Sequence, residues 1–418
     1  MTAGVGGMIL FMGGQVLDPR WDSPRDGMEV LVEGGLIREV SDRPIASPSA
    51  TRMDLGGRVL MPGLIDAHVH VIAAMADLGA NAAQPSSLAA LRAGRIMAAM
   101  LMRGFTTVRD VGGADRGLVE AQAAGVAAGP RLVICGKALS QTGGHCDMRA
   151  RADDRAPPQH RVGAMGRLCD GVDAVRLAAR EELRAGADFI KVMANGGIAS
   201  PTDPIHMLQF SRAELLAAVE EAEGLGTYVS AHLYTDAAIR RAVECGVRSL
   251  EHCNLITEDT ARLAAAAGCT AVPTLITYER LAAEGAALGL RPDSVAKIET
   301  VRQAGLQSLH VMQAAGLPMA YGTDLLGEMH RHQSGEFALR ARALPALDVL
   351  RSATTVAARL CGLEGRTGVI EAGAWADLIV VDGDPLRDWG LLEGQGAHIP
   401  AIMQDGRFVK QELGGAGA

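Results

Sequence analysis

Two histidines separated by a single residue, His68 and His70, are the side chains of this sequence most clearly suited to metal chemistry. Residues i and i+2 of a β-strand point to the same face, so both imidazoles of such a pair can reach one metal ion. Pro62-Gly63 marks a turn, and Leu64 and Ile65 supply the apolar start of a buried strand. We therefore predict a strand that carries the pair out of the core. Taken alone, the pair fits two partly buried histidines with ordinary hydrogen bonds equally well.

Four polar residues at later apolar segments extend this candidate site. Lys191 lies inside the apolar stretch 189–193, where an ammonium without partners is costly to bury. His232, His252 and Asp324 each end or follow a similar stretch and offer a nitrogen or oxygen ligand. A core histidine is common, and an aspartate at a strand end often caps the next helix, so these three also fit structural roles. The buried lysine is the hardest of the four to explain without a function.

Short apolar segments alternate with alanine-rich helical stretches between residues 62 and 362. The segments that we expect to form strands include residues 106–110, 131–134, 189–193, 228–232, 249–252 and 319–324. This alternation is typical of βα units around a parallel sheet. We predict an α/β protein with a (β/α)8 TIM barrel over residues 62–362, rather than a doubly wound sheet. Active sites of such barrels lie at the carboxyl ends of the strands, where the polar residues above occur.

The two ends of the chain have a different sequence pattern, in which short strand-like segments are separated by turns. Segments 8–12, 28–32 and 36–40 near the start, and 376–381 and 401–403 near the end, read as strands. Asp405-Gly406 adds a hairpin signal to the last of them. We therefore expect residues 1–61 and 363–418 to form one small β-sandwich domain.

Composition excludes several classes of partner. The 418 residues are 48% hydrophobic, and 40 basic and 48 acidic residues give a net charge of −8 without long runs of one sign. Neither a nucleic-acid footprint nor a basic membrane patch is present, and no segment approaches the length of a membrane span. The seven cysteines form no Cys-x-x-Cys pair, which indicates free thiols in a reducing compartment and favours a cytoplasmic location. A small, roughly neutral molecule is the expected substrate.

A His-x-His, a lysine, two further histidines and an aspartate occur here in the order seen in the amidohydrolase superfamily, which the chain resembles. The resemblance implies that Lys191 is N-carboxylated by carbon dioxide and bridges two divalent metal ions. It also implies that His68, His70 and Asp324 hold the more buried ion, and that His232 and His252 hold the more exposed one. These imidazole and carboxylate ligands suit zinc, and manganese or cobalt also fit.

The resemblance covers nearly the whole chain and is nearest to the branch of binuclear Xaa-Pro dipeptidases (prolidases) and imidazolonepropionase-like enzymes. Segments 103–110, 138–145, 195–204 and 321–328 carry it. By this likeness His145 and Tyr234 face the substrate, where they polarise the scissile carbonyl or hold the substrate's acidic end. His145 equally fits a role in fixing its own glycine-rich loop, and Tyr234 a packing role at the rim.

The activity implied is hydrolysis of the amide bond in a dipeptide or an N-acyl amino acid by a hydroxide shared between two metal ions. Asp324 would accept the proton of the nucleophilic water and deliver it to the departing amine. Relatives of this kind commonly assemble, so a homo-oligomer acting on a small-molecule amide is expected, with neither nucleic acid nor membrane as partner.

Two segments depart from what is expected of proline-specific enzymes. Residues 205–211 are bulkier, and the loop 151–161 looks shortened, so both are expected to line or gate the substrate pocket. Met207, Phe210 and Leu325 are the predicted pocket residues. A larger apolar entrance favours N-acyl aromatic amino acids, including amides of the ochratoxin type. Met207 and Phe210 fit equally well as packing residues beneath the following helix.

Two other classes of function remain as alternatives. A hydrolase of a cyclic amide or a deaminase would share the barrel, but deaminases of this superfamily normally lack the bridging lysine, which is present here as Lys191. A non-catalytic assembly scaffold is the more remote alternative, because such relatives have lost metal ligands and this chain keeps all six.

Overall fold

The computed structural model describes residues 7–290 and 292–413, which divide into two compact units. The first unit contains residues 7–65, 99–107 and 345–413, and the second contains residues 66–98 and 108–344 without position 291. Each unit has its own layers of secondary structure. The candidate ligands all belong to the second unit.

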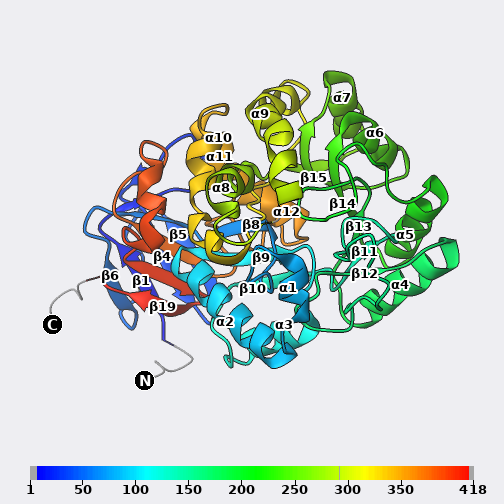
Figure 1. Cartoon of the computed structure of the whole chain (residues 1–418). Coiled ribbons are helices and arrows are strands. Elements are labelled where there is room, and N and C mark those ends of the chain that lie inside the picture. Colours follow the sequence, from blue (N-terminus) through cyan, green and yellow to red (C-terminus); the bar gives the residue numbers. More distant parts are fainter. Residues whose placement is uncertain (1–6, 291, 414–418) are drawn as a thin grey trace. The chain divides into compact units, whose positions relative to one another are not determined.

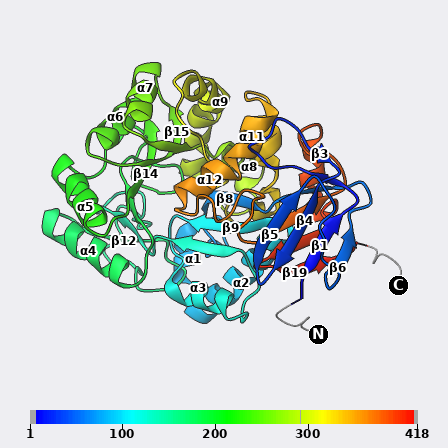
Figure 2. The same cartoon turned by 180° about the vertical axis from the view of Figure 1, so that it is seen from behind.

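The first unit has two sheets, one of which brings together strands from both ends of the chain (Figure 2). One sheet has the order β5-β4-β1-β6, formed by Leu36–Ser41, Glu29–Glu33, Ile9–Met12 and Thr51–Asp54. The other has the order β19-β18-β17-β7-β2-β3, formed by Arg407–Gln411, Ala401–Gln404, Leu378–Val381, Val59–Pro62, Gln15–Val16 and Arg25–Asp26. The antiparallel pairing of β7 with β17 joins the N-terminal and C-terminal segments. Helices α11 (Ala346–Ser352) and α12 (Thr355–Leu360) also belong to this unit.

Turns and core of the first unit follow from the sequence. Gly34 and Gly35 both have positive φ between β4 and β5, as do Asp405 and Gly406 between β18 and β19, which is the backbone that a two-residue hairpin turn requires. Side chains from both sheets, such as Phe11, Val30, Leu60, Leu378 and Met403, share one buried apolar cluster. The predicted strands at both ends of the chain are therefore confirmed as strands.

The second unit is an α/β structure in which parallel strands alternate with helices (Figure 1). One sheet has the order β10-β9-β8, formed by Arg131–Ile134, Phe105–Asp110 and Leu64–Val69. The longer sheet has the order β12-β11-β13-β14-β15-β16, formed by Gly166–Leu168, Ala138–Ser140, Ile190–Met193, Val229–Thr235, Ser249–Leu255 and Thr270–Val272. All pairings in the longer sheet are parallel.

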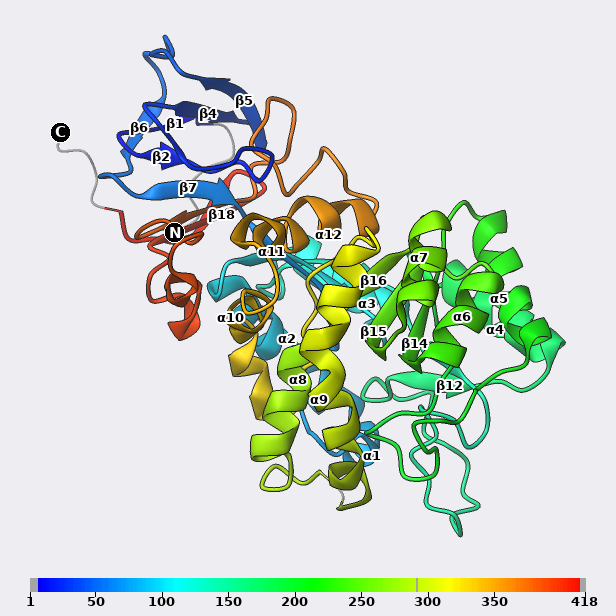
Figure 3. The same cartoon turned by 90° about the horizontal axis from the view of Figure 1, so that it is seen from above.

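Helices α4 (Val172–Arg184), α5 (Arg212–Gly224), α6 (Asp236–Glu244) and α7 (Glu258–Ala266) cover the outer side of these strands (Figure 3). Ser211 begins α5 with a capping box to Glu214, and the Thr257 hydroxyl caps α7. The other helices are α1 (Leu78–Ala83), α2 (Ser86–Met102), α3 (Arg116–Ala123), α8 (Leu275–Arg280), the π-helix η1 (Leu281–Gly285), α9 (Pro292–Ala314), η2 (Gly327–His332) and α10 (Gly335–Arg340). No helix within the described residues is both long enough and apolar enough to cross a membrane.

The strands predicted at 106–110, 131–134, 189–193, 228–232 and 249–252 correspond to β9, β10, β13, β14 and β15. The predicted α/β class is therefore confirmed. Residues 319–324 differ from the prediction, because they form an isolated parallel bridge between Met319 and Ala271 instead of a regular strand. The backbone departs from extended geometry at Asp324, where φ is +52°. Single backbone hydrogen bonds still join the segment to its neighbours, from Ala320 N to Ala271 O and from Ala67 N to Tyr321 O.

Candidate metal centre

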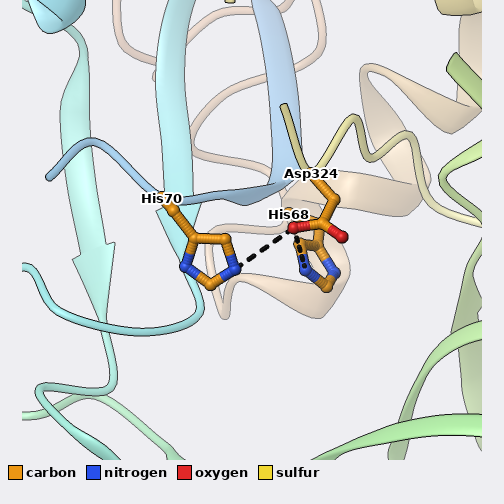
Figure 4. Close-up of side chains that lie close together, drawn as sticks. All are labelled: His68, His70 and Asp324. Carbon is orange, nitrogen blue, oxygen red and sulfur yellow. Dashed lines mark ion pairs between the residues drawn. The ribbon is translucent and has the colours of Figure 1, made fainter. Parts of the chain in front are cut away.

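His68 and His70 lie at the carboxyl end of β8, with both imidazoles turned toward Asp324 (Figure 4). Asp324 Oδ1 is 3.2 Å from His70 Nε2 and 3.5 Å from His68 Nε2. One ligand atom from each residue lies within 4.8 Å of the others. Both histidines are buried, whereas the Asp324 side chain is 21% exposed. Three ligands from distant parts of the sequence thus converge on one point.

Asp324 reaches this point because its backbone is left-handed. Its N–H donates to the His68 carbonyl at 2.8 Å, which fixes the segment against the end of β8. A non-glycine residue at positive φ is uncommon, and such residues concentrate at functional sites. The conformation orients the carboxylate toward the two imidazoles.

The second nitrogen of several candidate ligands is held by a hydrogen bond. His68 Nδ1 donates to Glu251 Oε2 at 2.7 Å, and His70 Nδ1 donates to the Gly112 carbonyl at 3.0 Å. His252 Nδ1 lies 2.8 Å from Thr274 Oγ1. Such contacts fix the tautomer and leave Nε2 as the atom with a lone pair for a metal.

His232 and His252 extend the cluster from β14 and β15. Their ring centroids are 4.6 Å apart, and that of His252 is 4.9 Å from that of His68. Nε2 of His232 is buried and has no hydrogen-bond partner among the described residues. A buried nitrogen without a partner is costly, and a cation at this position would satisfy it.

Backbone strain also brings consecutive residues of β15 to the site. His252 and Cys253 have φ of +72° and +57°. The pairing of β14 with β15 shifts register near the same point, between Leu233 and Thr235. Glu251 and His252, which would face opposite sides of a regular strand, therefore both contact His68.

Lys191 lies in β13 opposite Ser230 of β14 and is 1% exposed. Burial lowers the pKa of its ammonium, Glu251 opposes that effect, and the Arg109 guanidinium adds to it. This lysine lies in the wall of the same cavity as the histidines.

A buried ion pair lies beside the ligands. Glu251 Oε1 accepts from Arg109 Nη2 at 2.7 Å and from the hydroxyls of Ser230 and Ser249 at 2.6 Å each. Burial raises the pKa of Glu251, but the charges of Arg109 and Lys191 outweigh it and hold the pKa well below its usual range. Glu251 is therefore a carboxylate.

Three of the candidate ligands, His232, His252 and Asp324, favour the protonation states that metal binding requires. For His68, burial lowers the pKa, but the charges of Asp324 and Glu251 outweigh it and raise the pKa. Burial lowers the pKa of His232 and of His252 well below the usual value, and repulsion from neighbouring histidines adds to the effect. For Asp324, burial raises the pKa, but His68 and His70 outweigh it and hold the pKa well below its usual range. Neutral imidazoles with an ionised carboxylate and an unpartnered nitrogen fit a divalent cation of the zinc type.

A cavity of about 630 Å³ collects the predicted site residues. Its wall contains the six predicted ligands and the two predicted substrate-facing residues: His68, His70, Lys191, His232, His252, Asp324, His145 and Tyr234. The loop 151–161 also contributes to the wall, through Asp153, Arg155, Ala156, Pro157, Pro158, Gln159 and Arg161. The structure thus places together residues that are up to 256 positions apart in the sequence, from His68 to Asp324.

Three predicted pocket residues lie elsewhere, because Met207, Phe210 and Leu325 are not among the residues that line this cavity. Phe210 and Leu325 are buried, and Leu325 packs in an apolar cluster with Tyr234. The Phe210 amide donates to the Gln141 side chain, which holds the start of α5. Met207 is partly exposed, and its carbonyl accepts from the Gly196 amide.

The side chain of His145 is fixed by contacts with the neighbouring loop and with His232. Its Nδ1 is 2.7 Å from Ser200 Oγ and 3.3 Å from Asp203 Oδ2, and its ring stacks on His232 with centroids 4.2 Å apart. A Cβ on Gly197 would lie 1.8 Å from the His145 ring, so only glycine fits beneath it. Both structural roles and a substrate-facing role are compatible with this placement.

Sequence reasoning missed residues that complete the site. Glu251 and Arg109 lie inside apolar strands, as Lys191 does, so the same argument about buried charge could have identified them. Tyr278 lies on the cavity wall with its hydroxyl 3.3 Å from that of Tyr234. A tyrosine within a helical segment carries no signal of this role in the sequence.

Comparisons with known proteins agree with this geometry. The model of the amidohydrolase family matches residues 59–409. The chain is 33% identical to ochratoxinase from Aspergillus niger over 365 residues. The matched region covers 84% of this chain and 76% of that protein. A crystal structure of an amidohydrolase is 53% identical, with a TM-score of 0.96 and coverage of 97% of this chain and 100% of that one. A prolidase complexed with N-methylphosphonate-L-proline is 51% identical, with a TM-score of 0.95 and the same coverage, 97% and 100%. The chain therefore belongs to the amidohydrolase family and is a hydrolase that acts on amide bonds.

Proposed function

We propose that this protein is a binuclear metal-dependent hydrolase that cleaves N-acyl amino acids and dipeptides with an apolar acyl side. The observation that carries the proposal is the convergence of four histidines, a buried lysine and an aspartate on the wall of one cavity. The likeness to a prolidase and to an ochratoxinase supports cleavage of an amide next to a free carboxylate.

In this proposal the ligands divide between two positions. His68, His70 and Asp324 would hold one divalent cation, and His232 and His252 would hold the other. Lys191, N-carboxylated on Nζ, would be a ligand of both, and its negative charge would remove the cost of burying an ammonium. When bound, such cations activate water near neutral pH and stabilise the oxyanion that develops on the carbonyl.

Asp324 is the group that moves the proton. Its carboxylate takes a proton from the water whose oxygen bonds to the carbonyl carbon, and then gives that proton to the amide nitrogen as the C–N bond breaks. The products are a carboxylic acid and a free amine. Because Asp324 is partly exposed while His68 and His70 are buried, it is the member of this trio that a substrate can approach.

The cavity wall supports an apolar acyl group. Leu78, Met148, Met165, Ile198, Leu281 and Leu326 line it. Arg149 and Arg155, which also line it, are each paired at 2.7 Å with an aspartate two residues earlier, Asp147 and Asp153. These arginines therefore have carboxylate partners of their own, and the substrate carboxylate is assigned to Tyr234 and His145.

A closed (β/α)8 barrel is part of the same proposal, because the ligands must meet at one end of a ring of strands. Backbone hydrogen bonds that support closure join Val111 N to Val69 O, Asp188 N to Ile134 O, Ala320 N to Ala271 O and Ala67 N to Tyr321 O. We likewise propose that the two sheets of the first unit form a β-sandwich, since one apolar cluster receives side chains from both.

The test is a substrate panel assayed with the zinc-reconstituted protein in bicarbonate buffer. The panel contains Xaa-Pro dipeptides, N-acyl phenylalanines, and Xaa-Arg and Xaa-Lys dipeptides, ranked by kcat/KM. We expect apolar N-acyl amino acids and Xaa-Pro to lead, and the matched amino acid amides without a free carboxylate to react poorly. Asp324→Asn is the inactive control. Inert amides together with turnover of a lactone or a cyclic imide would overturn the proposed reaction.

A further inference from the structure

Within the described residues, the candidate ligand histidines differ in what holds their second nitrogen. His68 Nδ1 donates to a buried carboxylate, Glu251 Oε2, at 2.7 Å. His70 Nδ1 donates to a backbone carbonyl, and His252 Nδ1 lies beside the Thr274 hydroxyl. A carboxylate partner makes an imidazole a stronger donor to a metal than a neutral partner does.

Glu251 is itself held firmly. Its second oxygen accepts from Arg109 Nη2 at 2.7 Å and from two serine hydroxyls, and both Glu251 and Arg109 are fully buried. Arg109 Nε also donates to the Ala67 carbonyl, one residue before His68. The carboxylate is thus fixed to the backbone of the strand whose imidazole it orients.

The left-handed backbone at His252 makes this arrangement possible. It allows Glu251 to reach His68 while the next residue, His252, turns its own ring toward the same cavity. Strained backbone often occurs at functional sites. Here the strained segment supplies both a candidate ligand, His252, and the carboxylate of Glu251, which orients His68.

We propose that Glu251 is a positioning residue that makes the His68/His70/Asp324 position the tighter of the two metal positions. This inference rests on the proposed binuclear site. The ligand atoms of that trio already lie within 4.8 Å of one another, and Glu251 holds His68 in the tautomer with Nε2 free. At the other position, His252 Nδ1 lies 2.8 Å from a neutral partner, the Thr274 hydroxyl.

A metal titration tests the proposal directly. The metal-free protein competes for Zn²⁺ with a chromogenic chelator in bicarbonate buffer, first as wild type and then as Glu251→Gln. We expect two zinc ions per wild-type chain with unequal affinities. In Glu251→Gln, which keeps size but loses charge, the tighter dissociation constant should rise by roughly 10- to 100-fold. Unchanged affinities, or weakening confined to the second ion, would overturn the inference.

Ser230→Ala is the matched control. Ser230 Oγ donates to Glu251 Oε1, so its removal perturbs the same carboxylate while leaving the oxygen bonded to His68 in place. The tighter zinc affinity of this variant should equal that of the wild type within the error of the titration. A loss as large as that of Glu251→Gln would show that packing around Glu251, rather than its bond to His68, sets the affinity.

A second readout uses the wild type alone and remains informative if Glu251→Gln fails to fold. Imidazole ¹⁵N NMR of the zinc-loaded protein should show His68 with a proton on Nδ1 and none on Nε2. The opposite tautomer would overturn the inference. A wild type that binds fewer than two zinc ions would instead contradict the proposed function, so the two failures are distinguishable.

Discussion

The two sides of the cavity in the second unit are built from different kinds of structure. The candidate ligands include residues of buried strands, such as His68 of β8, Lys191 of β13 and His252 of β15. Another part of the wall comes from the segment 145–161, where no helix or strand is present among the described residues. Its ion pair between Arg155 and Asp153 involves an arginine that is 84% exposed. From this difference we expect the strands to fix the chemistry and the loop to influence which substrate is accepted.

The largest effect is expected from Lys191→Ala on the strand side. This change removes the ligand assigned to both metal positions, so kcat/KM should fall by more than about 1000-fold and zinc content should drop. Small carboxylic acids such as acetate should restore part of the activity, because they can occupy the space of the missing carboxylate. Zinc per chain and kcat/KM are measured with and without acetate. Undiminished turnover would contradict a bridging lysine.

The next effect is expected from Gly197→Ala, beneath the His145 ring. A new Cβ would overlap the ring, which must then move, and displacement of a substrate-facing group by about 1 Å can cost roughly 100-fold in rate. We expect kcat/KM to fall while zinc content stays unchanged. Gly94→Ala is the matched control, because a Cβ at Gly94 meets nothing within 4 Å. Wild-type kinetics in Gly197→Ala would show that His145 does not act on the substrate.

A smaller effect is expected from Tyr278→Phe. This substitution removes only the hydroxyl that lies 3.3 Å from the Tyr234 hydroxyl. The loss of one hydrogen bond, worth about 0.5–1.5 kcal/mol, should raise KM for a free-acid substrate by about two- to tenfold with little change in kcat. The comparison substrate is the matching amide, whose KM should not respond. An equal change for both substrates would remove Tyr234 from recognition of the carboxylate.

The smallest effect is expected on the loop side from Arg155→Ala. Exposed ion pairs contribute little to stability, so the melting temperature and zinc content should remain those of the wild type. Substrate preference is the quantity that should change, because Arg155 lines the cavity. Ranking the same substrate panel by kcat/KM measures this. A loss of bound zinc would contradict the division of roles between strands and loop.

Much of the site could be predicted from sequence because buried strands have a clear pattern. Apolar segments that contain or precede Lys191, His232 and His252 identified the strands, and these three residues line one cavity. The resemblance to the amidohydrolase superfamily is confirmed by the family match. The assignment of each ligand to a metal position stays a prediction.

Other features depend on tertiary structure that the sequence does not reveal. The positive φ at Asp324 and His252 follows from contacts across the sheet rather than from local preference, so the non-strand ending at 319–324 was not foreseen. Met207 and Phe210 are bulky, but bulk does not determine whether a side chain faces a cavity or the core. In the structure, Met207, Phe210 and Leu325 do not line the cavity, and Phe210 and Leu325 are buried.

The most direct test of the central claim is the number of zinc ions per chain, measured by elemental analysis after reconstitution in bicarbonate and removal of loosely bound metal. Hydrolysis of an N-acyl amino acid is followed on the same samples. The account predicts two zinc ions per chain, with activity that is lost on chelation and restored by zinc. Fewer than one ion per chain in a sample that hydrolyses the amide at full rate would contradict it.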